Sequence, residues 1–456
     1  MTKKQQIQEV LNNHPELRGK LYERGFVFTN ADVNEKIYPF YGLWQTRKIG
    51  AYNLLVSEQQ RYYVVENSDK IFVLIGHAYN PFKMQCDEND ILHSLAEKEF
   101  ASDAFWSDIN ELTGVFTVII LIGERAFIFG DASCMQTTFY NEKGNIVCVS
   151  SHANLIGDIL NEERDEYVNR LSRYRFFKLL GNALPGNLTQ FKDVKRLIPN
   201  HYAEFVGGGV KIYRFYYPQK IACDIAEVIN LSAEILHKNL QLITKKWKKP
   251  AISMTGGCDS KTTLACANGL YENFLYFSYS SSESEEVDAQ AAHKICNELG
   301  LEHKIYNIPE EDGKIPLIES IRLILERNTG DVIPNNKNDV RKRAYFATKN
   351  DFDIEVKSWA SEIGRAYFSK RFNGRKNFGK KPTPRKCTTL YKFFLNNRKL
   401  VRQTDKVFAE YLEKYFDRKS ENPIEWQEQF FWEFRVASWN GLVITGEHRY
   451  SFDITI

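Results

Sequence analysis

An apolar segment, a glycine turn and a helix-like segment follow one another within residues 250–268, and this order constrains the fold more than any other stretch. Residues 251–254 are mostly apolar and predict a short strand. Residues 255–260 (Thr-Gly-Gly-Cys-Asp-Ser) predict a turn, and 261–267 predict a helix that ends before Gly269. A strand, a glycine turn and a helix in this order direct backbone N–H groups and a helix N-terminus toward one point, which suits an anion.

The side chains of this turn suit phosphate oxygens. Gly256 and Gly257 allow the backbone to approach a ligand closely, and Thr255 and Ser260 supply hydroxyl donors. Asp259 would repel a phosphate unless a cation lies between them, so it indicates a bridging metal ion. The alternative interpretation is an ordinary strand-to-helix turn in which Asp259 caps the helix.

The spacing of the turn excludes two common phosphate-binding motifs. It matches neither the Walker pattern G-x-x-x-x-G-K-[ST] nor the dinucleotide pattern G-x-G-x-x-G. It resembles the S-G-G-x-D-S pyrophosphate loop (PP-loop) of N-type ATP pyrophosphatases, with Thr255 in the first serine position. The resemblance implies ATP and Mg²⁺ as ligands. The residues that it assigns to the nucleotide here are Met254, Thr255, Gly256, Gly257, Asp259 and Ser260.

The residues after the turn predict a doubly wound parallel sheet. Strand-like segments at 274–279 and 302–308 flank a helical segment at 288–299, and ligands in such sheets bind beyond the carboxyl ends of the strands. Residues 284–304 closely resemble the matching part of asparagine synthetase-like proteins. In that family the backbone at the end of the second strand contacts adenine, which here implies Phe277 and Ser278. A core aromatic is the alternative for Phe277.

A third segment, Ser-Trp-Ala-Ser-Glu-Ile-Gly-Arg-Ala-Tyr at 358–367, resembles a diverged branch of this family. That branch combines T-G-G-x-D-S-[RK] with a later G-E-I-x-R. The resemblance implies Asp259 and Glu362 as metal ligands and Lys261 and Arg365 as phosphate contacts. Two acidic residues stand here in asparagine synthetases, and Ser361 replaces one of them. For Lys261 and Arg365 the alternative is a solvated cation.

The N-terminal half predicts a different architecture. Strand-like runs dominate 51–150 around a helical segment at 91–112, which indicates an α+β sandwich. Residues 114–119 and 184–202 look like the Ntn amidotransferase-like domain of asparagine synthetase relatives and its junction with the next domain. Glutamine-using members begin with a nucleophilic Cys. Residues 1–85 contain no Cys, so we expect a glutaminase fold without glutaminase chemistry, and we reject Thr2 as a nucleophile.

Composition narrows the function classes. A net charge of +3 is too small to indicate a polyanion partner by itself, and the eight cysteines form no C-x-x-C pair. We expect reduced thiols and a cytoplasmic protein without a membrane span. We do not expect a nucleic-acid partner, and a homodimer stays open. Residues 363–404 hold 13 Lys and Arg and no Asp or Glu. We expect a mobile loop there, with phosphate contact or a nucleic-acid groove as alternatives.

These observations predict an α+β sandwich at 1–215, then an α/β doubly wound parallel sheet of the adenine nucleotide α-hydrolase-like (PP-loop) kind at 216–456. The resemblance implies an ATP-dependent ligase that adenylates a small-molecule or peptide carboxylate and transfers it to an amine. Its expected catalytic residues are Asp259, Glu362, Lys261 and Arg365. The alternatives are an RNA-modifying enzyme of the same fold and a non-catalytic relative that binds a nucleotide or a partner.

Overall fold

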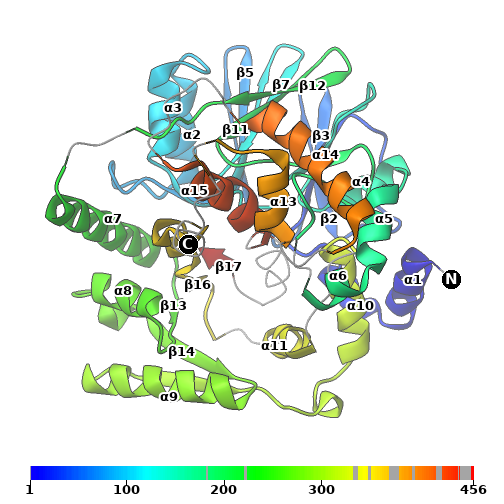
Figure 1. Ribbon diagram of the computed structural model, residues 1–456. Coiled ribbons are helices and arrows are strands. Elements are labelled where there is room, and N and C mark those ends of the chain that lie inside the picture. Colours follow the sequence, from blue (N-terminus) through cyan, green and yellow to red (C-terminus); the bar gives the residue numbers. More distant parts are fainter. Residues whose placement is uncertain are drawn as a thin grey trace.

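The computed structural model describes residues 2–180, 183–219, 223–331, 337–347, 351–368, 379, 381–392, 396–416, 424–439, 441 and 453–455. Two six-stranded sheets occupy the N-terminal half, and a five-stranded sheet follows (Figure 1). The expected order of a sandwich followed by a parallel sheet is therefore present. The parallel sheet lies below the sandwich in Figure 1.

The first sheet has the order β10-β8-β9-β1-β3-β2, and its pairs are antiparallel. The second has the order β12-β11-β7-β6-β5-β4 and is also antiparallel. Their strands are β1 (Phe26–Thr29), β2 (Trp44–Ile49), β3 (Tyr52–Ser57), β4 (Tyr62–Asn67), β5 (Lys70–Tyr79), β6 (Thr113–Ile122), β7 (Arg125–Gly130), β8 (Phe139–Asn141), β9 (Cys148–Ser150), β10 (Val194–Arg196), β11 (His201–Val206) and β12 (Gly209–Arg214).

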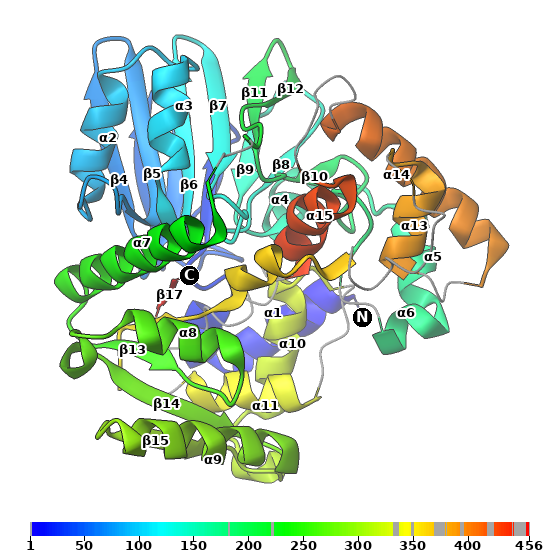
Figure 2. The same ribbon diagram turned by 60° about the vertical axis from the view of Figure 1, so that its left-hand side comes forward.

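The two sheets pack face to face, and helices cover their outer faces. Phe28 and Leu54 of the first sheet meet Val73 and Ile119 of the second in one buried cluster. Residues of β5 and β6 that point the other way pack under α2 and α3 (Figure 2). Both faces of β5 and β6 are thus covered, which explains why these strands are almost uniformly apolar. The helices of this half are α1 (Lys3–Asn13), η1 (Pro15–Lys20), α2 (Glu88–Ala96), α3 (Asp103–Asn110), α4 (Ala153–Leu160), α5 (Glu166–Arg173) and α6 (Arg175–Leu180).

The third sheet is parallel throughout, in the order β15-β14-β13-β16-β17. Strand order runs one way from β13 to β15 and then resumes at β16, on the other side of β13. The point of reversal therefore lies between β13 and β16, where α/β sheets bind their ligands. The strands are β13 (Pro250–Ser253), β14 (Leu275–Ser280), β15 (His303–Asn307), β16 (Ile354–Val356) and β17 (Asp453–Thr455).

Helical segments connect these strands. Their bounds are α7 (Ile225–Lys246), α8 (Cys258–Cys266), η2 (Tyr271–Asn273), α9 (Glu283–Glu298), η3 (Asp312–Lys314), α10 (Ile318–Asn328), α11 (Lys337–Phe346) and η4 (Trp359–Arg365). Helix α9 starts five residues earlier than expected because Ser282 caps it, its side chain accepting from the Glu285 N–H. No described helix is long and apolar enough to cross a lipid bilayer.

The last helical segments pack against the sandwich. Val115, Met135 and Ile198 of the sandwich share a buried cluster with the aromatic side chains of this region. The segments are α13 (Pro384–Lys392), α14 (Arg398–Tyr415), α15 (Trp426–Phe430) and the π-helical turn η5 (Phe431–Val436).

The expectation of one mobile loop over residues 363–404 is wrong in part. Helix α13 and the start of α14 fall inside this stretch, and Cys387, Leu390 and Leu400 are buried there. Apolar residues at helical spacing pack on the sandwich, so the many cations lie on the opposite, solvated face. Residues 369–378, 380 and 393–395 of the stretch lie outside the described residues.

Candidate functional site

The turn between β13 and α8 lies at the point where strand order reverses. Ala251 and Ile252 are fully buried in the sheet, and the chain leaves it at Met254. Helix α8 begins at Cys258, three residues before the predicted start. Asp259 and Ser260 therefore belong to the first turn of the helix and not to the loop.

The hydroxyl groups of the turn hold its shape. Ser260 is buried, and its Oγ accepts a hydrogen bond from the Thr255 N–H (3.2 Å) and donates to the Thr255 carbonyl (3.1 Å). The Thr255 hydroxyl accepts from the Gly257 N–H (3.1 Å). The hydroxyls of Thr255 and Ser260, which were expected to donate to a phosphate, are thus engaged within the loop. The N–H groups at the helix N-terminus are therefore the main donors left for a ligand.

The N-terminus of α8 has no side-chain cap. Gly257 is the N-cap residue, and within the described part of the chain no side-chain cap hydrogen bond is made there. The capping alternative for Asp259 is therefore wrong, since Asp259 lies two residues inside the helix. Gly256 packs tightly against α9, since an added Cβ would lie 3.0 Å from Asp288 Oδ1 and 3.3 Å from Ala291 Cβ. The turn thus lies close against α9.

Two sequence-distant candidates meet at this turn. Arg365, at the end of η4, donates through Nη2 to Asp259 Oδ2. This hydrogen bond raises the pKa of Arg365, and Glu362 adds to the effect through its charge. The Ser358 and Thr263 hydroxyls lie 2.6 Å apart and join the start of η4 to α8. The structure therefore brings Asp259 and Arg365 into contact, and Glu362 is near enough to act on Arg365 through its charge.

The other predicted contacts are distributed differently. The Lys261 side chain is exposed on α8, one turn beyond the loop. Ser361 donates to the Ser358 carbonyl (2.7 Å) and so shapes η4. Phe277 is buried and stacks on Phe352, with ring centroids 4.7 Å apart, which agrees with the core-aromatic alternative.

Ser278 is also committed to the interior. Its Oγ donates to the Met254 carbonyl (2.7 Å) and accepts from His303 Nε2, 2.9 Å away. His303 Nδ1 then lies 3.3 Å from His293 Nδ1 of α9. Burial, with a smaller contribution from His293, lowers the pKa of His303 to about 4. The neutral imidazole thus supports the strand end from which the turn starts, and only the main chain of Phe277 and Ser278 could contact a nucleotide.

Sequence reasoning missed Asp288, His303 and the Thr263–Ser358 link. Asp288 had a signal, since it falls in the segment that resembles asparagine synthetase-like proteins. His303 and Ser358 gave none, because a lone histidine in a strand and a serine after one have many uses. Among the described residues, no group of three or more His, Cys, Asp or Glu side chains could hold a metal ion.

The N-terminus carries no nucleophile arrangement at Thr2. The Thr2 hydroxyl accepts from the Gln5 N–H (3.2 Å), and the Thr2 N–H donates to Gln5 Oε1 (2.8 Å). This reciprocal pair is a capping box for α1. Thr2 thus has a structural use as the cap of α1.

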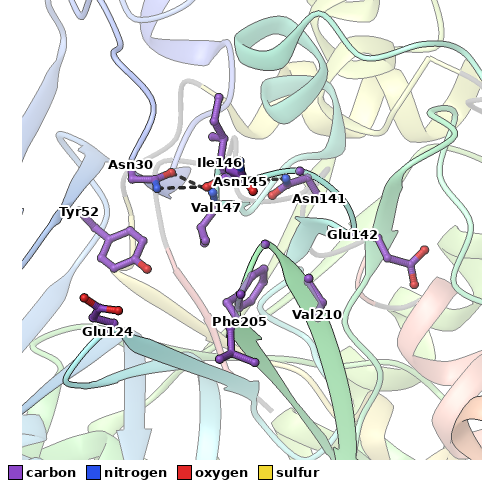
Figure 3. Close-up of a pocket in the computed structure, with 15 residues that line it drawn as sticks. Asn30, Tyr52, Glu124, Asn141, Glu142, Asn145, Ile146, Val147, Phe205 and Val210 are labelled. Carbon is purple, nitrogen blue, oxygen red and sulfur yellow. Dashed lines mark hydrogen bonds between the residues drawn. The ribbon is translucent and has the colours of Figure 1, made fainter.

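A cavity of about 170 Å³ lies elsewhere, at one end of the sandwich (Figure 3). Three turns form its rim, and its lining includes Asn30, Tyr52, Glu124, Asn145 and Phe205. None of the predicted site residues is among the residues that line it. It is therefore separate from the α8 turn.

Comparison with known proteins shows no matching family and only weak structural likenesses. No protein-family model and no curated protein sequence matches this chain. Glutamine phosphoribosylpyrophosphate amidotransferase from B. subtilis, complexed with ADP and GMP, is 11% identical over 80% of this chain and 76% of that one, with a TM-score of 0.26. A structure described as the allosteric regulatory enzyme of purine biosynthesis is 10% identical over 73% and 88%, with a TM-score of 0.29.

Glutamine-dependent NAD+ synthetase from Acinetobacter baumannii, in complex with ADP, is 13% identical over 57% of this chain and 65% of that one, with a TM-score of 0.23. All three TM-scores are well below 0.5. These likenesses therefore support no conclusion about the activity of this chain.

Proposed function

We propose that this chain binds ATP at the turn between β13 and α8 and uses it to activate a carboxylate for amide-bond formation. One observation carries the proposal. An uncapped helix N-terminus lies where the strand order of a parallel sheet reverses, and Asp259 and Arg365 meet there from positions 106 residues apart.

The charges at this site suit a polyphosphate. The first-turn N–H groups of α8 and the helix dipole favour an anion, and Arg365 adds a cation whose side chain is 48% exposed. The Asp259 carboxylate opposes an anion unless it is itself neutralised, which Arg365 does in this structure. A nucleotide with a bound cation would release Arg365 to contact phosphate oxygens.

The proposed chemistry has two balanced steps. A substrate carboxylate oxygen attacks the α-phosphorus of ATP, the bond to the bridging oxygen breaks, and pyrophosphate leaves from an acyl-adenylate. An amine then attacks the acyl carbon, AMP leaves with the bonding electron pair, and the amine loses a proton. The α8 N-terminus and Arg365 would stabilise the charge on the departing pyrophosphate.

A magnesium ion fits the residues present. Mg²⁺ is usually bound by one or two carboxylates together with phosphate oxygens and water. Asp259 contacts the guanidinium of Arg365, and Glu362 acts on the same guanidinium through its charge. These two residues would hold it. When bound, the ion would neutralise phosphate charge. We also propose that the protein is cytoplasmic, where its eight free cysteines would stay reduced.

Asp259→Asn tests the proposal. We expect ATP–pyrophosphate exchange to fall by about two orders of magnitude or more, while the melting temperature stays nearly unchanged because an exposed ion pair contributes little stability. Asp103→Asn changes a first-turn carboxylate of α3 and is the matched control. Normal exchange in Asp259→Asn, or its unfolding, would show that this turn has no catalytic role.

The same assay separates the alternatives. Exchange that requires RNA and no added carboxylate would favour the RNA-modifying enzyme. A non-catalytic relative has one observation in its favour: Arg365 already neutralises the carboxylate expected to bind the metal. ATP binding by calorimetry without exchange under any condition, and without dependence on Mg²⁺, would favour that function.

A further inference from the structure

Amide side chains hold one wall of the cavity at the end of the sandwich. This wall is residues 144–147, in the turn between β8 and β9. Asn30, just after β1, accepts through Oδ1 from the Val147 N–H (2.8 Å). Asn141, at the end of β8, donates through Nδ2 to the Ile146 carbonyl (2.6 Å). The turn is therefore fixed from both sides, and the protein itself shapes the cavity beside it (Figure 3).

A turn of the second sheet closes against this wall. A Cβ added at Gly208 would lie 2.7 Å from Asn145 Oδ1, so the Asn145 side chain lies directly over the turn between β11 and β12. Lys143 and Gly209 form an antiparallel bridge between the same two turns. The cavity thus lies where a turn of the first sheet meets a turn of the second.

The floor of the cavity is apolar. It is formed by residues that belong to or pack against the core between the two sheets: Tyr52, Val147, Phe205 and Val210. The Tyr52 ring stacks on Phe28, with ring centroids 4.5 Å apart, which fixes its position. The cavity measures about 170 Å³. A space of about 150 Å³ accommodates benzene, so this cavity suits a ligand with an apolar body of about six carbon atoms.

Two polar groups of the lining have no hydrogen-bond partner among the described residues. They are the exposed carboxylate of Glu124, between β6 and β7, and the hydroxyl of Tyr52, a residue only 9% exposed. Burial raises the pKa of Tyr52, and the charge of Glu124 adds to this effect, so the two groups lie close together. Figure 3 shows the Tyr52 hydroxyl on the side of Glu124. Buried hydroxyls are normally hydrogen-bonded, so a ligand in the cavity would supply the missing partner.

The charge of the lining favours a cation. Glu142, its second carboxylate, is already bound by Lys414. No Lys, Arg or His is among the described residues that line the cavity. The uncompensated charge is therefore that of Glu124, and it is negative. The aromatic rings of Tyr52 and Phe205 also attract a cation.

We propose that this cavity binds a small organic ammonium ion with an apolar body, such as a primary arylalkylamine. The ammonium donates to the Glu124 carboxylate and to the Tyr52 hydroxyl, and the apolar body lies on Phe205 and its neighbours in the floor. The ligand contacts turns of both sheets and so stabilises this end of the sandwich. The site shares no residue with the proposed ATP site, and the two proposals stand or fall separately.

Isothermal titration calorimetry at neutral pH tests the proposal, with benzylamine as the probe. We expect saturable binding with a Kd of about 1 mM or lower. Benzyl alcohol has nearly the same shape without the charge, and it should bind at least about tenfold more weakly. Glu124→Gln should weaken benzylamine at least about tenfold and leave benzyl alcohol unchanged. Tyr52→Phe keeps the stacked ring and should weaken benzylamine about threefold or more.

Glu142→Gln is the matched control, because it removes the other carboxylate of the same lining. Since Lys414 already binds Glu142, we expect the Kd for benzylamine to change by less than about twofold. Equal effects of Glu124→Gln and Glu142→Gln would overturn the proposal. The absence of saturable binding up to about 20 mM benzylamine would do the same.

Methylamine distinguishes the cavity from a surface ion pair. It carries the same ammonium without the apolar body, so it should bind at least about tenfold more weakly than benzylamine. Benzylamine should also raise the melting temperature of the wild type more than that of Glu124→Gln, because a ligand stabilises the state that binds it. Equal binding of the two amines would show that Glu124 forms only an exposed ion pair and that the cavity is not a site.

Discussion

Two arginine–aspartate pairs in this molecule use the same chemical groups for different purposes. Arg327 belongs to α10, and its side chain, 3% exposed, binds Asp158 of α4 (2.7 Å) and Asp331. Arg365 binds Asp259 at the α8 turn with its side chain 48% exposed. The buried pair joins two parts of the fold, whereas the exposed pair can separate when a ligand arrives.

Further polar groups contact the Arg327 group. The Asn154 side chain donates to the Arg327 carbonyl (2.6 Å), and the Tyr38 hydroxyl donates to Asp158 Oδ2 (3.0 Å). Burial raises the pKa of Tyr38, and Asp158 adds to the effect. Buried charges are stable only while all their partners remain. Removal of one partner therefore costs far more unfolding free energy than the intact pair contributes.

The largest expected effect comes from Arg327→Met. This change leaves Asp158 and Asp331 without their buried cation, and we expect a loss of about 3–5 kcal/mol of unfolding free energy. Chemical denaturation measures it. Arg322→Met is the control on the same helix, because its partner Glu319 is exposed, and it should change stability by less than about 0.5 kcal/mol. Equal effects of the two variants would contradict the role assigned to burial.

The second prediction concerns pH and the support of the exposed site. The folded pKa of His303 is about 4, below the ordinary value of about 6.5. Between these values the unfolded chain binds a proton that the folded chain does not, so stability falls as the pH falls from about 6.5 toward 4. The slope from this group is at most about 1.4 kcal/mol per pH unit.

His303→Gln should remove this contribution and reduce the slope by up to one proton. His201, whose pKa is also lowered to about 4 by burial and by Arg214, stays in both proteins and provides the remaining slope. Denaturant midpoints between about pH 4.5 and pH 7 measure the difference. An unchanged slope would show that His303 is not held neutral.

The smallest effect on stability is expected at the exposed pair. Arg365→Met should change the unfolding free energy by less than about 1 kcal/mol, yet weaken ATP–pyrophosphate exchange. Lys261→Met removes an exposed cation from α8, the helix that carries Asp259. It should reduce exchange less, because among the described residues no hydrogen bond or ion pair joins Lys261 to Asp259. Measurements of ATP–pyrophosphate exchange and of thermal melting on the same preparations test this prediction. A large loss of stability in Arg365→Met would make this pair structural.

The sequence by itself determined the features that depend on neighbours in the chain. The glycine turn after residues 251–254 predicted β13 and α8 because strand, turn and helix preferences act within a few residues. Strand-like runs in the N-terminal half predicted β4 to β7 for the same reason. The predicted start of α8 was three residues too late, since Gly257 takes the extended N-cap conformation that leads directly into Cys258.

Tertiary structure alone decided which distant residues meet. Arg365 reaches Asp259 across 106 residues, and Arg327 reaches Asp158 across 169; neither arginine differs in sequence from a solvated one. The same holds for the cation-rich helices α13 and α14, whose apolar faces pack on the sandwich. Local periodicity predicts which face of an element is apolar. It does not predict what covers that face, because the partner is chosen by the packing of the whole chain.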